Sequence, residues 1–185
     1  MNTTIEHPFN EFPKMARFSR EAVITEKIDG TNGQILIEQD GTFLTGSRSK
    51  WITPQDDNYG FSRWAHEHKD ELIQGLGPGR HFGEFWGNGI QRNYGLKEKR
   101  FSLFNTTRWT KEAPPACCHV VPVLWTGPFD ALEDVVPTIL SDLQNSGSKA
   151  ALGFMDPEGI VIFHVAGNVG FKKTIRNDDK PKSLV

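Results

Sequence analysis

One lysine stands in a pattern that could make it a nucleophile. Lys27 lies in the stretch TEKIDGTNG, residues 25–33, between two apolar runs of β type. A lysine amine that attacks phosphorus must first lose its proton, which from a pKa of about 10.4 costs roughly 4–5 kcal/mol at neutral pH. A tight turn at Gly30 would hold the amine rigidly, and Gly33 would let the backbone approach a ligand. An ordinary hairpin turn with a solvated lysine fits the same residues.

The elements expected around this motif are mostly strands. Apolar runs between turn residues predict strands over 22–25, 34–38, 42–45, 80–86, 101–104, 120–124, 159–165 and 169–175. Apolar residues at helical spacing predict helices over 59–75 and 130–144, with Pro137 marking either a kink or the true start of the second. Strands with two interposed helices predict one α+β domain over residues 1–185.

The composition excludes several classes of protein. The 185 residues carry 21 Lys and Arg against 23 Asp and Glu, a net charge of −2, so bulk electrostatics cannot coat nucleic acid. No apolar run reaches membrane-spanning length, which indicates no membrane partner. The cysteines, Cys117 and Cys118, are adjacent and give no disulfide framework, so we expect a reducing cytoplasm.

Further short patterns follow the lysine motif in a fixed order. They are GSR at 46–48, HFGEFWG at 81–87, FSLFN at 101–105, PEGIVI at 157–162 and GFKKT at 170–174. Together with KIDGTN at 27–32 they resemble the covalent nucleotidyltransferases, the polynucleotide ligases and capping enzymes, and most closely the RNA ligase 2 branch. The resemblance runs from residue 11 to about 182. It implies a nucleotidyltransferase (ligase adenylation) fold with antiparallel sheets, flanking helices and a nucleotide cleft.

The resemblance implies an ATP site. Lys27 would attack the α-phosphate of ATP, expel pyrophosphate and hold AMP as a phosphoramidate. Glu26 would meet the adenine amino group, Phe104 would stack on the adenine ring, and Ile28 would also contact ATP. Without the resemblance, we would expect Glu26 to be a surface carboxylate of a strand and Phe104 to be a core side chain.

The ribose and the phosphates have their own implied contacts. Asn32 and Arg48 would reach the ribose or the phosphates, although Arg48 is equally typical of a solvated hairpin charge. Alternation along a strand predicts that Glu84 shares a face with Phe82 and Trp86. A carboxylate on such an aromatic face needs a partner, and the resemblance implies a ribose hydroxyl.

The last two patterns imply a metal ligand and a phosphate ligand. Glu158 would bind Mg²⁺ or Mn²⁺, unless it is a plain turn carboxylate. Adjacent residues of a strand face opposite ways, so Lys172 and Lys173 cannot both reach one phosphate, and we favour Lys172. The chain departs from the family twice, with Asn105 where Asp is usual and Thr174 where a second lysine is frequent.

The resulting hypothesis is an ATP-dependent RNA ligase. It would join 5′-phosphate and 3′-hydroxyl ends through lysyl-AMP and an adenylylated 5′ end, with a catalytic domain and no C-terminal OB or helical domain. Its partners would be RNA ends, with a nicked duplex and a partner subunit for nucleic-acid grip left open. Local grip would come from basic residues, namely Lys97, Lys99, Arg100, Arg108 and Lys111. Two alternatives stay open: a DNA or nicked-duplex ligase, and an end-binding module that adenylylates itself without joining.

Overall fold

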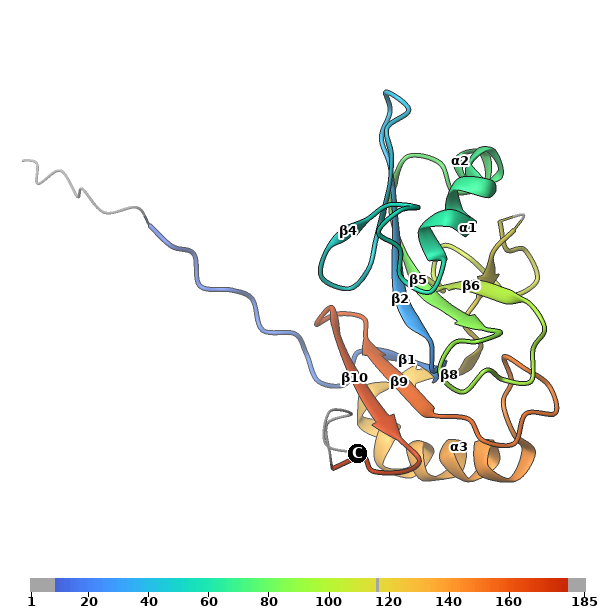
Figure 1. The fold of residues 1–185 in the computed structure, drawn as a ribbon. Coiled ribbons are helices and arrows are strands. Elements are labelled where there is room, and N and C mark those ends of the chain that lie inside the picture. Colours follow the sequence, from blue (N-terminus) through green and yellow to red (C-terminus); the bar gives the residue numbers. More distant parts are fainter. Residues whose placement is uncertain (1–8, 116, 180–185) are drawn as a thin grey trace, which may run out of the picture.

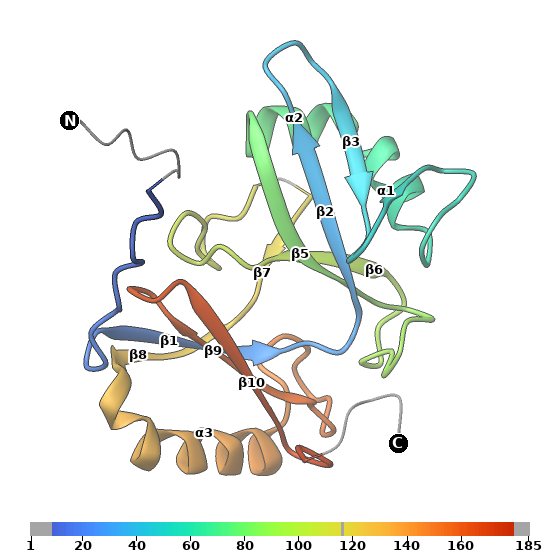
Figure 2. The same ribbon diagram turned by 90° about the vertical axis from the view of Figure 1, so that its left-hand side faces the viewer.

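Two β-sheets meet where strand β1 (Glu21–Lys27) leads into strand β2 (Thr31–Ile37) (Figures 1 and 2). The computed structural model describes residues 9–115 and 117–179. Within these ranges the strands form a four-stranded sheet, in the order β10-β9-β1-β8, and a six-stranded sheet, in the order β4-β3-β2-β5-β6-β7. None of the described helices is long and apolar enough to cross a membrane.

The four-stranded sheet is antiparallel and has a helix on one face. Its strands are β1 (Glu21–Lys27), β8 (Val123–Pro128), β9 (Gly159–His164) and β10 (Val169–Thr174). The turn η1 (Phe129–Ala131) leads into α3 (Leu132–Ser146), which lies along the sheet in Figure 2. Ile24 and Ile160 of the sheet pack with Val136 and Leu143 of α3 because alternate strand residues face the same side. The opposite face, with Lys27, is turned away from this core.

The six-stranded sheet is covered on one face by two short helices. Its strands are β2 (Thr31–Ile37), β3 (Phe43–Gly46), β4 (Trp51–Ile52), β5 (Gly79–Gly87), β6 (Lys99–Leu103) and β7 (His119–Val120). All neighbours are antiparallel except β6 and β7, which are parallel. Helices α1 (Phe61–Glu67) and α2 (Lys69–Leu76) contribute to a core with the buried rings of Phe61, Phe85 and Phe101.

The chain passes between the sheets next to a third apolar cluster. Residues 28–30 connect β1 to β2, and residues 121–122 connect β7 to β8. The cluster contains Ile28, Trp86, Tyr94, Val121 and Ala151, all at most 5% exposed. It holds both crossing segments in place, so the ends of β1 and β5 face each other.

The predicted α+β class with antiparallel sheets is confirmed, and three elements differ from the prediction. The helix expected over 59–75 is interrupted at His68, which has φ −104° and ψ 18°. The strand expected over 120–124 is split between the two sheets at Val121 and Pro122. Pro137 lies inside α3 and is not its start, because apolar residues from Leu132 onward already pack against the sheet.

Candidate active site

Lys27 ends β1 at the opening between the two sheets. Its backbone pairs with Gly159, and its ammonium Nζ lies 2.5 Å from Oε2 of Glu158. The side chain of Lys27 is 19% exposed and that of Glu158 is 3% exposed. Glu158 stands directly before β9, as the sequence predicts, and strand pairing carries it against the lysine. The structure therefore encloses the amine beside a carboxylate, unlike a solvated hairpin lysine.

Glu84 lies on β5, in the six-stranded sheet, whereas Lys27 belongs to the four-stranded sheet. The backbone N–H of Gly30 donates to its Oε1 at 3.1 Å, and the side-chain amide of Asn32 donates to its Oε2 at 3.0 Å. A Cβ on Gly30 would stand 2.4 Å from the carbonyl oxygen of Phe85, so only glycine lets the β1–β2 connection pass this close to β5. Burial raises the pKa of Glu84 to about 7, while the charge of Lys27 opposes that rise. The carboxyl can thus accept or donate a hydrogen bond near neutral pH.

Gly33 plays a different part from the one predicted. It was expected to let the backbone approach a ligand, but it faces the core of the six-stranded sheet. A Cβ there would lie 2.6 Å from Cζ of Phe61 and 3.0 Å from Cε2 of Phe101. The ligand prediction is wrong because β2 turns this residue towards the aromatic core.

Glu26 is buried on the face of β1 opposite to Lys27. The hydroxyl of Ser148 donates to its Oε1 at 2.6 Å, and the backbone N–H groups of Lys149 and Ala150 donate to its Oε2 at 2.7 and 3.0 Å. Burial raises the pKa of Glu26, and these donors oppose that rise. The alternative of a surface carboxylate is wrong, since Glu26 is 1% exposed. Its contact with adenine stays a prediction.

The other predicted ATP contacts lie on the six-stranded sheet or at its border. Phe104 directly follows β6 and is 42% exposed, so its ring is available for stacking and is not a core side chain. Arg48 is exposed in the loop between β3 and β4. The side chain of Ile28 is buried in the cluster between the sheets, so a contact with ATP would use its backbone.

The register of β10 separates the two candidate phosphate ligands. Lys172 pairs with Val161, and Thr174 pairs with Gly159, which in turn pairs with Lys27. Directly paired residues share a face, so Lys172 and Thr174 lie on the same face as Lys27. Lys173 faces the other way, and its ammonium is 3.0 Å from Oδ2 of Asp178. The placement favours Lys172.

An ion-pair network that the sequence reasoning missed links the motif segments. Nε of Arg92 donates to Oδ2 of Asp29 at 3.0 Å, and its Nη1 donates to Oδ2 of Asp156 at 2.6 Å. The backbone N–H of Asp29 donates to the hydroxyl oxygen of Tyr94 at 2.8 Å. Arg92 and Tyr94 belong to the loop after β5, where positive φ at Gln91 and Tyr94 is the backbone sign of a constrained segment. In the sequence this loop, residues 88–98, carries none of the motifs quoted above, so nothing there singles out Arg92 or Tyr94.

The described residues offer a metal ligand but no complete metal cage. No group of three or more His, Cys, Asp or Glu side chains within them could hold a metal ion. Mg²⁺ is commonly held by one or two carboxylates together with water and substrate phosphates. The carboxylate of Glu158, a hard oxygen donor in the cleft, fits that manner of binding.

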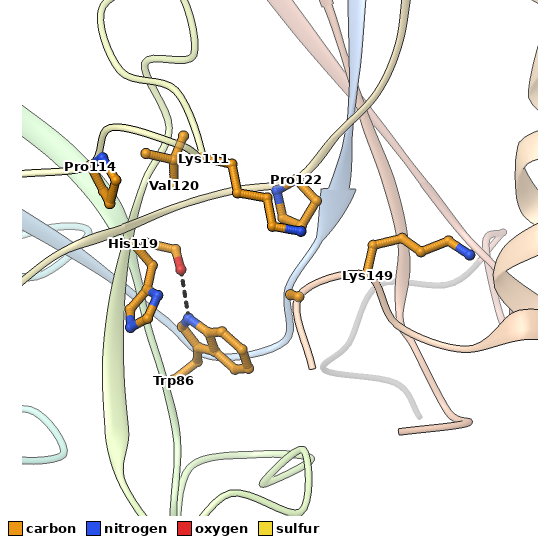
Figure 3. A pocket seen from close by; sticks show the side chains of 9 residues that line it. Trp86, Lys111, Pro114, His119, Val120, Pro122 and Lys149 are labelled. Atoms are coloured by element: carbon orange, nitrogen blue, oxygen red, sulfur yellow. Dashed lines mark hydrogen bonds between the residues drawn. The ribbon is translucent and has the colours of Figure 1, made fainter. Parts of the chain in front are cut away.

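A small pocket is lined in part by Lys149 and Ala150, whose backbone N–H groups donate to Glu26 (Figure 3). Its lining includes Trp86, His119, Pro122 and Lys149, and its volume is about 70 Å³. The indole N–H of Trp86 donates to the hydroxyl of Ser102 at 2.9 Å, while the ammonium of Lys149 points away from the pocket. Ligand pockets usually measure about 300–1,000 Å³. This pocket is too small for a nucleotide, so it is not a candidate site for ATP.

Comparisons with known proteins agree with this architecture. The sequence model of a family described as RNA ligase matches residues 20–175. An archaeal ATP-dependent RNA ligase aligns with a TM-score of 0.63 at 18% identity, over 88% of this chain and 48% of that one. A mutant of the Naegleria gruberi RNA ligase, solved with ATP and Mn, aligns with a TM-score of 0.62 at 20% identity, over 86% and 51%. The chain thus spans about half the length of these structures. No curated protein sequence matches it.

Proposed function

The chain belongs to the RNA ligase family, and on that premise we propose that it joins RNA ends with ATP, using Lys27 as the nucleophile. The observation that carries the proposal is the enclosed pair of Lys27 and Glu158, 2.5 Å apart, on a cleft that also holds Glu84. A half-buried lysine at a strand end, held by an ion pair, is positioned in the way a covalent nucleophile requires. ATP as the nucleotide is supported by the archaeal structure, which is of an ATP-dependent RNA ligase, and by the Naegleria structure, which was solved with ATP and Mn.

The proposed reaction has three displacements at phosphorus. The unprotonated amine of Lys27 attacks the α-phosphorus of ATP, an N–P bond forms, and the P–O bond to pyrophosphate breaks. A 5′-phosphate oxygen of the RNA then attacks the same phosphorus, which breaks the N–P bond and leaves the RNA end adenylylated. Finally a 3′-hydroxyl attacks the 5′-phosphorus, loses its proton and expels AMP. Positioning and charge neutralisation provide most of the catalysis in such transfers.

The residues of the cleft divide this work. Lys172 shares the face of Lys27 and would neutralise charge on the α-phosphate. Glu84, with Asn32 bonded to it, would receive the ribose hydroxyls, and Phe104 would stack on the base. Glu158 holds the ammonium of Lys27 in an ion pair, and neutralising this carboxylate would release the lysine side chain towards the α-phosphate. A divalent cation at Glu158 would supply that neutralisation and would shield the phosphates.

The substrate and the setting are further parts of the proposal. We propose RNA ends as the substrate on the strength of family membership. A reducing, cytoplasmic setting is consistent with Cys117 and Cys118, which are free thiols in the structure.

The decisive experiment is covalent labelling. The purified chain is incubated with α-³²P-ATP and Mg²⁺ or Mn²⁺, and label that survives a denaturing gel is counted. We expect label on the wild type and on Lys69→Ala, a lysine of α2 outside the cleft, and none on Lys27→Ala or Lys27→Arg. EDTA should abolish labelling. Label on Lys27→Ala would overturn the assignment.

A ligation panel then tests the substrate. The adenylylated protein is offered nicked RNA, nicked DNA and single-stranded RNA ends, and products are resolved by length. Joining of RNA in preference to DNA is the expected outcome. Joining of DNA alone would favour a DNA ligase, and self-labelling without any product would favour an end-binding module.

A further inference from the structure

A row of exposed aromatic side chains crosses the six-stranded sheet next to Glu84. Trp51 pairs with Gly46, Gly46 with Gln34, and Gln34 with Phe82. The backbone N–H of Phe104 donates to the carbonyl of Phe82 at 3.0 Å, which extends the row by one strand. Directly paired residues project from the same face, and strands lie about 4.8 Å apart, so this row is about 19 Å long. We call it the aromatic row.

The aromatic row is more exposed than packing alone explains. Trp51 is 45% exposed, Phe82 is 51% exposed and Phe104 is 42% exposed, although all three lie on or beside regular strands. Leu44, on the same face, is 40% exposed. In contrast, the other face of these strands is closed by α1 and α2. An exposed apolar surface of this kind marks a site of interaction.

The aromatic row is continuous with the proposed active site. Asn32, Glu84 and Ser102 form the next row of paired residues, two positions along their strands and hence about 7 Å away. Phe104, at the end of the aromatic row, is also the predicted stacking partner of adenine. A ligand that leaves the nucleotide site along this face would meet Phe82 and then Trp51.

The row is held rigid and carries positive charge. Nη1 of Arg80 donates to Oε1 of Gln34 at 2.6 Å, and the guanidinium lies 5.1 Å from the ring centre of Trp51. The other end of the Gln34 amide donates to the carbonyl of Ser47 at 3.1 Å. Arg48 is exposed in the adjacent loop. An arginine beside an exposed ring, with a second exposed arginine in the neighbouring loop, suits a ligand that combines phosphates with bases.

Several of the basic residues first expected to grip nucleic acid are engaged elsewhere. Their partners are the carbonyl of Tyr59 for Lys99, the carboxylate of Glu98 for Arg100 and the carbonyl of Leu76 for Arg108. These contacts stabilise loops around the six-stranded sheet. Arg80, which contacts the ring of Trp51, is therefore better placed to meet an RNA strand that enters the site.

We propose that the aromatic row binds the unpaired nucleotides next to the reacting RNA end, with Phe82 and Trp51 stacking on bases and Arg80 and Arg48 contacting phosphates. This inference rests on the proposed function for the identity of the substrate. Single-stranded RNA suits the row because its bases can be splayed onto aromatic rings, whereas the bases of a duplex are already stacked and paired.

The test measures RNA binding and self-labelling on the same 185-residue chain. Fluorescence anisotropy measures the Kd for a labelled 12-nucleotide single-stranded RNA and for a 12-base-pair RNA duplex. Trp51→Ala and Phe82→Ala should each weaken single-strand binding by about tenfold and keep their thermal midpoints, because both side chains are exposed. Trp51→Phe should restore most of the affinity. Tyr59→Ala, which removes an aromatic that is 47% exposed but lies off the row, is the matched control and should bind like the wild type.

The outcomes separate this inference from the proposed function. Label from α-³²P-ATP should remain on Trp51→Ala, because the row binds RNA and not the reacting lysine. If the wild type takes no label but RNA binding still depends on Trp51, the proposed function fails and the aromatic row stands. Unchanged RNA affinity in both alanine variants overturns the row, and a changed sedimentation coefficient in them would mark the face as a protein interface instead. A preference for the duplex also overturns it.

Discussion

The two sheets bring different chemistry to the cleft between them. The four-stranded sheet presents charge, with Lys27 and Lys172 on one face and Oε2 of Glu158 at 2.5 Å from Nζ of Lys27. The six-stranded sheet presents Glu84, whose pKa is raised to about 7, and the exposed rings of the aromatic row. In the proposed function the first surface handles phosphates and the second handles ribose and bases. On that proposal, one nucleotide site would be assembled from two surfaces with separate chemical tasks.

Arg92 is the main charged link between these two surfaces. It belongs to the loop after β5 of the six-stranded sheet, and it pairs with Asp29 after β1 and with Asp156 before β9. In the sequence, Asp29 stands two residues after Lys27, and Asp156 stands two residues before Glu158. The network therefore fixes the distance between the charged surface and the aromatic one.

The largest effect should come from the charged surface. Lys172→Ala should lower the rate of self-labelling by about 10³-fold, because a missing phosphate ligand leaves transition-state charge uncompensated. Lys173→Ala should lower it less than threefold, since its ammonium pairs with Asp178 on the opposite face. Single-turnover labelling measures both rates. Equal losses in the two variants would contradict the placement derived from the β10 register.

The next effect tests the near-neutral carboxyl of the other surface. Burial raises the pKa of Glu84 from 4.5 to about 7, so the folded state holds its proton more tightly than the unfolded state. The stability from this group is present below pH 4.5 and is lost as the pH rises through 7, a change of about 3 kcal/mol. In the ligand-free protein, Glu84→Gln should remove the part of the pH-dependent loss of unfolding free energy that comes from this carboxyl.

Urea unfolding at pH 5 and at pH 8 measures this change. The wild type should lose more unfolding free energy between the two values than Glu84→Gln does, while Glu112→Gln, an exposed carboxyl, should follow the wild type. Parallel pH profiles of the wild type and Glu84→Gln would show that burial of Glu84 costs little.

A smaller effect should follow from breaking the link between the surfaces. Arg92→Ala should lower the unfolding free energy by about 2 kcal/mol, because Asp29 is left buried with one partner fewer. Asp156→Asn should cost less than about 1 kcal/mol, since that carboxylate is 44% exposed. Urea titrations give both values. A larger cost for Asp156→Asn than for Arg92→Ala would place the centre of the network elsewhere.

The smallest effect contrasts the packing of the two sheets. Gly33→Ala should destabilise the chain by about 1 kcal/mol, because its Cβ would press on Phe61 and Phe101. Gly170→Ala, on β10, should be neutral or slightly stabilising, since the nearest atoms to its Cβ lie 3.9 Å away. Thermal unfolding of both variants provides the comparison. A stable Gly33→Ala would mean that the aromatic core yields more easily than its contacts suggest.

The fold class and the position of Lys27 at a strand end could be predicted from local patterns. The strand that ends at Lys27, the glutamate on an alternating strand and the carboxylate before β9 each depend on a few neighbouring residues. The sites of error are segments whose conformation depends on distant contacts. Residues 120–124 read as one strand, yet Val121 and Pro122 carry the chain from one sheet to the other.

By itself the sequence determined the order of the motifs, the strand around each one and the residues able to do chemistry, because side-chain type and a two-residue period are local properties. Tertiary structure alone decided that Arg92 joins Asp29 to Asp156 and that three separate aromatics form one row, and it placed Lys172, which the sequence already favoured, on the face of Lys27. The physical reason is that strand pairing and register join residues far apart in the chain. Those partners are chosen by the packing of whole sheets, and no local pattern encodes them.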